Sequence, residues 1–239
     1  MDKYKLTRFI DKYHLGGNVN AVVINSKGDT LSTRFITGDK ALLGELEMNS
    51  WSFQDAELGV YDTEQLSRLL GVLDDDVTLN LTQSGDKAIS VEISDALSKV
   101  NFMLSDKSVI NQTPPLKQLP EFQIAIKVDF NFIQRFISGK SALPDTDTFT
   151  VITDDDGVKL VIGYSSINTN RVTIPVETET HEDIENVSFN ANLFKDVLQA
   201  NKECESATLE VSEKGLSRIN FKVDQYDVTY YLVAVQDVD

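Results

Sequence analysis

The sequence predicts an α+β protein built from two copies of one unit, each an antiparallel sheet with two helices on one face. Three observations predict this fold class. Short apolar patterns recur at a nearly constant offset, strand-like segments outnumber helical ones in both halves, and four short amphipathic helices fall at equivalent places. Recurrence of this kind is the sequence signature of a repeated structural unit.

The repeat is indicated by three short matches that occur in the same order in both halves. Each pairs a segment of the first half with a segment 127 or 128 residues later. They are Thr7-Arg8-Phe9-Ile10 with Gln134-Arg135-Phe136-Ile137, Val23-Ile24 with Val151-Ile152, and Val60-Tyr61-Asp62 with Ser188-Phe189-Asn190. One such match can arise by chance, but three in order predict two domains, residues 1–106 and 122–239.

The segment between the copies, residues 107–121, reads as a connector. It contains Pro114, Pro115 and Pro120. Each proline lacks a backbone donor and restricts the preceding residue to extended geometry, so neither helix nor sheet is expected. We therefore expect an extended strap.

Four helices are predicted at residues 3–14, 62–73, 129–143 and 190–203. Each carries apolar residues at helical spacing, and Asp62 and Asn190 stand where helix N-caps are favoured. The apolar positions are Leu6, Phe9, Ile10 and Tyr13; Leu66, Leu69, Leu70 and Leu73; Ile133, Phe136 and Ile137; and Phe194, Val197 and Leu198.

Alternating apolar residues and polar turns predict strands in the remainder. In the first copy these are residues 19–25, 30–37, 41–48, 77–82, 88–93 and 99–104. In the second copy they are residues 148–153, 158–164, 171–177, 207–211, 217–223 and 228–235.

Composition indicates a globular chain of the cytoplasm. Of its 239 residues, 41% are hydrophobic and 25% charged. No apolar run approaches the roughly 18 residues that a membrane-spanning helix needs, and the N-terminal residues lack the apolar core of a signal peptide. Cys204 is the only cysteine, so no intrachain disulfide is expected, as in a reducing compartment. No membrane partner is expected.

No pattern in the sequence indicates catalysis, a metal or a cofactor. Asp74-Asp75-Asp76 and Asp154-Asp155-Asp156-Gly157 do not continue into a twelve-residue calcium loop, so we interpret them as turns. The acidic stretch at residues 177–185 is interpreted as a solvated loop. There is neither a phosphate-binding Gly-Lys-Ser/Thr loop nor a G-x-S-x-G motif. We expect a protein that is not an enzyme.

Charge is distributed unevenly between the helices and the rest of the chain. The net charge of −16 disfavours nucleic-acid binding for the chain as a whole. The four helical segments, however, hold nine of the 22 basic residues and only six of the 38 acidic ones, a net +3 against −19 elsewhere. Lys5, Arg8 and Lys12 follow helical spacing. A solvated face would explain one such helix, but four indicate a phosphate-binding surface that does not read sequence.

The duplicated unit, the segment from Glu57 to Leu73 and the terminal strand from Asp227 to Val235 resemble the DNA sliding clamps, particularly those of T-even-type bacteriophages. Proliferating cell nuclear antigen is similar in having two such domains per chain. The resemblance covers nearly the whole chain. The family begins each domain with a short strand before the first helix, and only residues 1–5 are available for it here.

The resemblance implies a ring of six domains, hence a homotrimer assembled head to tail around duplex DNA, with helices on the inner wall. Residues 171–177 of one chain would pair with residues 99–104 of the next. The ring would tether a DNA polymerase, an ATP-dependent clamp loader would open it, and a viral clamp would act in the host cytoplasm.

Two sets of site residues follow from the charge pattern and the resemblance. The basic helix residues expected to face DNA are Lys5, Arg8, Lys12, Arg68, Arg135, Lys140, Lys195 and Lys202. The apolar residues expected to bind the polymerase and loader, from the connector and the C-terminal strand, are Leu116, Leu119, Pro120, Val233 and Val235. The alternative is a duplicated β-rich structural protein of a virion, which explains the repeat and the acidity but not the basic helices.

Overall fold

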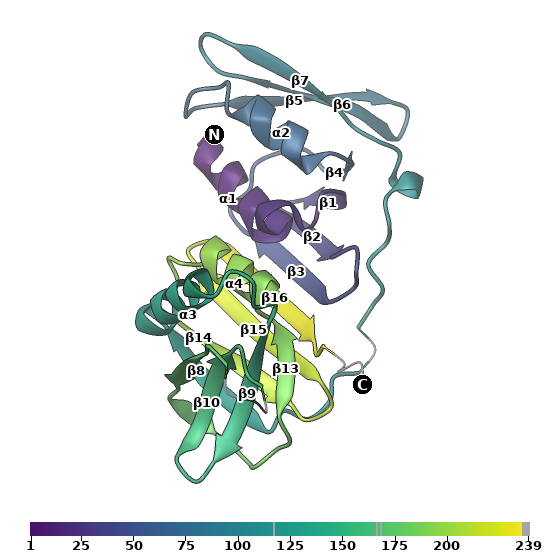
Figure 1. Cartoon of the computed structure of the whole chain (residues 1–239). Helices are drawn as coiled ribbons and strands as arrows, with labels where there is room; N and C mark the ends of the chain where they lie inside the picture. Colours follow the sequence, from purple (N-terminus) through teal and green to yellow (C-terminus); the bar gives the residue numbers. More distant parts are fainter. Residues whose placement is uncertain (117, 166, 168, 236–239) are drawn as a thin grey trace. The chain divides into compact units, whose positions relative to one another are not determined.

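The computed structural model describes residues 1–116, 118–165, 167 and 169–235 (Figure 1). Lys117 of the predicted connector and residues 166, 168 and 236–239 of the second predicted domain lie outside this part. The chain divides into two compact units. One comprises Met1–Ile36, Gly44–Pro114 and Asp224–Val228, and the other comprises Thr37–Leu43, Pro115–Val223 and Thr229–Asp239. The α+β class is confirmed. The limits 1–106, 107–121 and 122–239 stay a prediction.

All four predicted helices form, each after a short polar N-cap residue. They are α1 (Lys3–His14), α2 (Thr63–Leu70), α3 (Phe130–Ala142) and α4 (Ala191–Ala200). The Asp62 carboxylate accepts the Gln65 amide at 2.8 Å, and the Asn190 side chain accepts the amides of Asn192 and Leu193. These acceptors satisfy backbone donors that have no partner within the helix.

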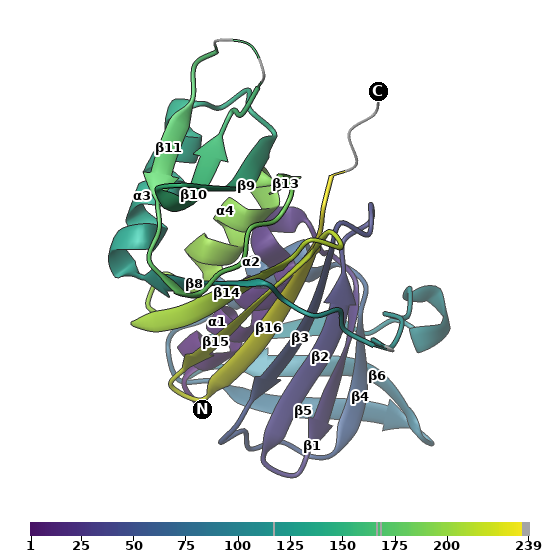
Figure 2. The same cartoon turned by 90° about the horizontal axis from the view of Figure 1, so that it is seen from below.

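The first unit contains two antiparallel sheets. One has the order β3-β2-β1-β4, from β1 (Val22–Lys27), β2 (Thr30–Ile36), β3 (Leu42–Met48) and β4 (Ala56–Val60). The other has the order β5-β6-β7, from β5 (Thr78–Ser84), β6 (Lys87–Ser94) and β7 (Lys99–Met103). Figure 2 shows the two sheets crossing one behind the other. Apolar side chains from both sheets, α1 and α2 fill the space between them.

Sequence patterns did not predict β4. Its glycine, Gly59, is unfavourable in strands, yet the structure requires a residue without a Cβ there. A Cβ at Gly59 would lie 2.2 Å from the Ser105 carbonyl oxygen, and the Ser105 amide donates to the Gly59 carbonyl at 2.9 Å. The chain therefore passes directly against β4 as it enters the connector.

The second unit repeats this plan. Its first sheet runs β11-β10-β9-β13, from β9 (Thr148–Asp154), β10 (Gly157–Ile162), β11 (Val172–Pro175) and β13 (Val187–Asn190). Its second runs β12-β8-β14-β15-β16, from β8 (Ile124–Asp129), β12 (Thr178–Thr180), β14 (Ser206–Ser212), β15 (Leu216–Val223) and β16 (Tyr226–Val233). Sequence patterns missed β8, β12 and β13. Both β8 and β13 continue directly into a helix, and β12 has only three residues.

Strand register establishes the duplication and corrects one match. The β1–β2 hairpin ends in the pair of Lys27 with Thr30, and the β9–β10 hairpin ends in the pair of Asp154 with Gly157. Ile24 therefore corresponds to Val151, at an offset of 127, whereas the sequence match aligned Val23 with Val151. Both Ile24 and Val151 are buried, while Val23 faces the other side of its strand. Adjacent apolar residues look alike in sequence, and only the register shows which one points inward.

In the first copy, the residues before α1 form one β-bridge. Asp2 bridges Asp76, the Met1 ammonium donates to the Val77 carbonyl at 2.8 Å, and the Val77 amide donates back to Met1 at 2.8 Å. The second copy has all six residues of β8 at this place, paired with β14.

An aromatic cluster forms the core beneath α3 and α4. The ring of Phe136, which is fully buried, lies 5.2 Å from that of Phe149 and 4.8 Å from that of Phe194, nearly perpendicular to both. We expect Phe136→Ala to lower the free energy of unfolding by about 3–5 kcal/mol, measured by urea denaturation. Phe130→Ala, at an exposed position of the same helix, is the control and should change it by less than about 0.5 kcal/mol. Equal losses would contradict this view of the core.

Candidate DNA-facing helices and docking segment

Arg8 of α1 is held by two tyrosines and a carboxylate. Its guanidinium carbon lies 5.5 Å from the ring centre of Tyr4 and 4.8 Å from that of Tyr226. Its Nη1 lies 2.8 Å from an oxygen of Asp224. Burial raises the pKa of Tyr226 to about 12, so its hydroxyl stays protonated and donates to the Lys5 carbonyl at 2.8 Å. No local pattern indicated that the hairpin turn at Asp224 would contact α1.

Two of the eight predicted DNA-facing residues are buried. Lys12 is 1% exposed, with its ammonium 5.3 Å from the Tyr226 ring centre. Lys140 is 3% exposed and donates to the carbonyls of Leu143 and Pro144 at 3.2 and 2.9 Å. Lys140 therefore caps the C-terminal end of α3, where carbonyls lack helical partners.

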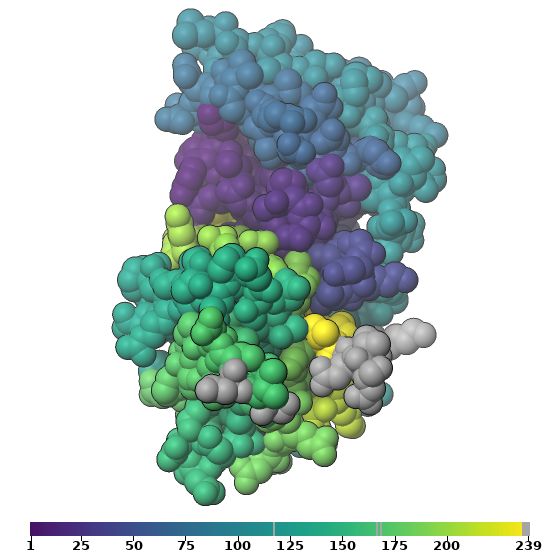
Figure 3. Space-filling view, viewed as in Figure 1, coloured from purple at the N-terminus to yellow at the C-terminus, as the bar shows by residue number. Residues whose placement is uncertain are grey.

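The other predicted residues reach the surface. Arg68 and Arg135 are exposed, and Lys5 and Lys195 are half-buried. Lys202 is exposed too, but it lies in the turn just after α4, not on the helix as predicted. Arg68 forms an ion pair with Glu64 one turn earlier, at 2.9 Å. The space-filling view shows α3, in teal, exposed at the surface of the second unit (Figure 3). Within each unit the two helices are neighbours, α1 with α2 and α3 with α4. Each unit thus carries basic side chains on a layer of two helices.

Arg135 also borders a cavity of about 230 Å³ between α3 and the segment from Ile174 to Glu177. Lys127 lines the same cavity and pairs with Glu177 at 3.3 Å. The lining contains two basic and two acidic side chains, so the cavity has no excess of positive charge.

The first half of the predicted connector is fastened to the first unit. Lys107 forms an ion pair with Glu57 of β4, Ile110 is buried beside Gly59, and Arg34 donates to the Pro114 carbonyl at 2.9 Å. A short 3-10 helix, Lys107–Val109, begins this segment. Beyond this single turn, residues 110–116 and 118–121 form neither helix nor strand.

The predicted docking residues keep apolar surface exposed. Leu116 is 37% exposed, Val233 49% and Val235 42%, while Leu119 and Pro120 are half-buried. Backbone bonds hold the end of the C-terminal strand in place. The Val233 amide donates to the Ala41 carbonyl at 2.9 Å, and the Val235 amide donates to the Ser188 carbonyl at 2.8 Å. The strand end is thus held in place while its apolar side chains remain exposed, so a binding partner can cover them.

Neither a membrane span nor a metal centre is evident in the part of the chain that the structure describes. No helix there is long and apolar enough to cross a bilayer. Nor do three or more His, Cys, Asp or Glu side chains converge there as metal ligands would.

The fold is similar to that of proteins named as proliferating cell nuclear antigens. The crystal structure of that antigen from Entamoeba histolytica superposes with a TM-score of 0.76 at 16% identity, over 99% of this chain and 97% of the other. A chain of the PCNA2–PCNA3 complex from Sulfolobus tokodaii gives 0.73 at 12% identity, over 98% and 97%. No family model matches the sequence, and neither does any curated protein. The likeness is one of fold and confirms the predicted clamp fold.

Proposed function

We propose that this protein, which has the sliding-clamp fold, forms a closed homotrimeric ring around duplex DNA and tethers a DNA polymerase. The observation that carries the proposal is the duplicated clamp unit over the whole chain, with basic residues concentrated on the helix layer of each copy. A ring leaves duplex DNA only by opening or by reaching an end. Weak contacts to phosphates therefore suffice for long residence, and tethering raises the effective concentration of the polymerase.

Two of the six described strands at sheet edges, β7 and β11, hold the segments expected to join successive chains. Among the described residues, β7 has only β6 as a neighbour in its sheet, and β11 has only β10. Unpaired edges of this kind are templates for pairing with another chain. Because β7 and β11 lie on different copies of the unit, their pairing is heterologous, and it can close a ring.

Two backbone hydrogen bonds within the chain indicate the register in which β7 and β11 would pair. In the first unit the Asn49 amide, just after β3, donates to the Gln225 carbonyl, just before β16, at 2.9 Å. In the second unit the Val233 amide donates to the Ala41 carbonyl at 2.9 Å. The two bonds follow the same antiparallel register.

Because the unit is duplicated, the same register is expected for the equivalent strands at the interface between chains. β11 holds the place of β3 in its copy, and β7 holds the place of β16. Phe35 over Gly44 and the pairing of Ile162 with Val172 make Gly44 equivalent to Val172. The helix N-caps Asp2 and Asp129 bridge Asp76 and Ser206, which are therefore equivalent. Followed across the next two strand pairs of each copy, this makes Lys99 equivalent to Thr229. With these equivalences, Lys99 of one chain lies opposite Thr173 of the next. This register supports the interface predicted between residues 99–104 and 171–177.

The proposed DNA track uses the accessible cations, Lys5, Arg8, Arg68, Arg135, Lys195 and Lys202. Lys12 and Lys140 are not part of this track, because their side chains are buried. A charge reversal at Lys12 would place a carboxylate among buried groups and disturb the fold, so it is unsuitable as a test.

We expect Arg135→Glu with Lys202→Glu to abolish processive synthesis by the polymerase while the mass of the oligomer stays unchanged. Reversing two cations replaces phosphate attraction by repulsion. Lys27→Glu with Lys214→Glu is the control, since it makes the same charge change at exposed positions in strand ends and turns that are not part of the helix layer. Processivity would be measured by product length on primed circular DNA with the loader and ATP. Equal activity of the two double variants would argue for the structural alternative.

The proposed partner site joins Leu116, Leu119 and Pro120 to Val233 and Val235. Exposed apolar side chains on a fixed strand end, next to a strap whose first half is held by Lys107 and Pro114, suit a short apolar peptide. We propose that the polymerase and the ATP-dependent loader share this site. The bacteriophage type of the clamp rests on the sequence resemblance.

A further inference from the structure

The turn between β15 and β16 brings a carboxylate to the basic face of α1. Asp224 stands in this turn with a backbone φ of 51°. Aspartate tolerates this left-handed conformation better than most residues with a side chain. The Asp224 side chain is 61% exposed, whereas that of Arg8, its partner at 2.8 Å, is 15% exposed. The carboxylate thus lies on the solvent side of the pair.

Arg8 is fixed independently of Asp224. The rings of Tyr4 and Tyr226 both lie within 5.5 Å of its guanidinium carbon. Tyr226 is itself held by its bond to the Lys5 carbonyl. A guanidinium held between aromatic rings retains its position when its anionic partner changes.

Carboxylate and phosphate are interchangeable partners of such a guanidinium. Both present oxygens that match the planar fork of N–H donors. We propose that Arg8 is a phosphate-binding residue of the DNA track, and that Asp224 occupies its site until a phosphate of the duplex displaces it. This inference rests on the proposed function. The exchange makes the gain from each Arg8–phosphate contact small, which suits a ring that slides.

The Arg68–Glu64 pair provides a comparison within the same unit. Both side chains are exposed, and the pair joins successive turns of α2 at 2.9 Å. Such pairs between exposed residues one turn apart contribute little. The Arg8–Asp224 pair differs from the Arg68–Glu64 pair because the rings of Tyr4 and Tyr226 hold the Arg8 guanidinium in place.

We expect Asp224→Asn to raise the affinity for duplex DNA about two- to fivefold, the range that an exposed ion pair supplies. Asparagine retains the turn, because it also tolerates positive φ. The probe is a labelled blunt duplex of mixed sequence, titrated with the trimer from low to physiological salt. The salt dependence should steepen, because the Asp224 carboxylate no longer competes with phosphate for Arg8.

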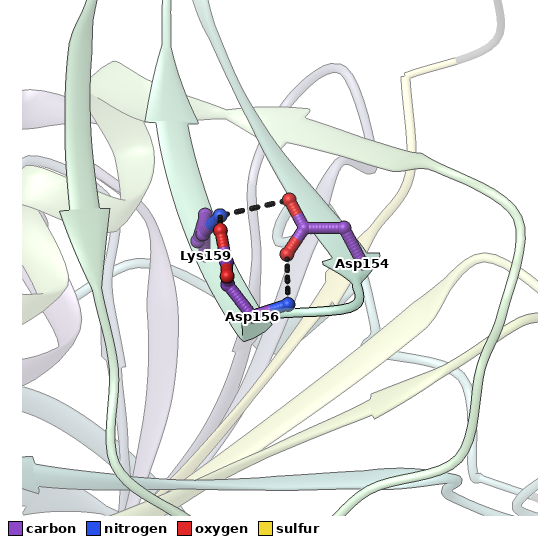
Figure 4. Close-up of polar contacts among 3 residues, drawn as sticks. All are labelled: Asp154, Asp156 and Lys159. Carbon is purple, nitrogen blue, oxygen red and sulfur yellow. Dashed lines mark hydrogen bonds and ion pairs between the residues drawn. The ribbon is translucent and has the colours of Figure 1, made fainter.

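Asp156→Asn is the matched control. It removes the same charge from the two-residue turn between β9 and β10, where Asp156 lies beside Lys159 (Figure 4). Its partner there is Lys159, at 3.1 Å, which keeps Asp154 at 2.8 Å. This variant should bind DNA like the unchanged protein. In an Arg8→Gln background, Asp224→Asn should have no effect.

Each result decides between the proposals. Equal gains from Asp224→Asn and Asp156→Asn would assign the effect to net charge and overturn the role of Asp224 alone. A gain that persists with Arg8→Gln would do the same. If the unchanged trimer does not support processive synthesis on primed circular DNA with the loader and ATP, the proposed function is overturned as well.

Discussion

A chain carrying Asn101→Cys and Arg171→Cys is expected to form a covalent ring of three chains when it is oxidised. The proposed register places Asn101 of one chain opposite Arg171 of the next, two residues along from Lys99 and Thr173. Directly opposed residues of antiparallel strands have Cα atoms roughly 4.5–5.5 Å apart, within the range of a disulfide. Non-reducing denaturing electrophoresis should then show a species of three times the chain mass.

The matched controls are the two single-cysteine variants, which leave each interface with one new thiol. Neither should form the covalent trimer, since the natural Cys204 is buried. Light scattering of the uncrosslinked double variant should give the mass of three chains. A monomer or dimer at all concentrations would contradict the ring, whereas a trimer that does not cross-link would contradict only the register.

Val233→Asp is expected to weaken binding of the polymerase by at least about tenfold. Burial of a valine side chain in a complex contributes roughly 1.5–3 kcal/mol, and about 1.4 kcal/mol corresponds to a factor of ten. A carboxylate without a partner in the same apolar contact adds a further cost. Affinity would be measured by calorimetry with the polymerase, or with a peptide of its C-terminal segment.

Val109→Asp supplies the control for this experiment. Val109 is an exposed valine of the connector, but it belongs to the half fastened to the first unit. A melting curve and a sizing column must show that both variants fold and form trimers. Unchanged affinity of the folded Val233→Asp trimer would place the docking site elsewhere on the ring. Equal losses from both variants would indicate a general effect of charge on the connector.

The amino-acid sequence alone determined the helices and the duplication. Asp62 and Asn190 act as the N-caps that residue type indicated, and the apolar stripes of all four helices face the core. These features are local, because capping and helical spacing involve residues within a few positions of one another. The sequence match that pairs Arg8 with Arg135 is likewise local, because the two residues occupy equivalent positions in α1 and α3.

Only the tertiary structure decided which cations reach the surface and what accompanies them. Lys12 follows the same helical spacing as Lys5 and Arg8, yet it is buried, with its ammonium over the ring of Tyr226. Helical spacing defines a face but cannot show which distant segment covers it. Asp224 meets Arg8 across 216 residues of sequence, and Gly59 is required by the close approach of Ser105. Such contacts depend on packing between segments that are remote in the chain, so no local pattern could reveal them.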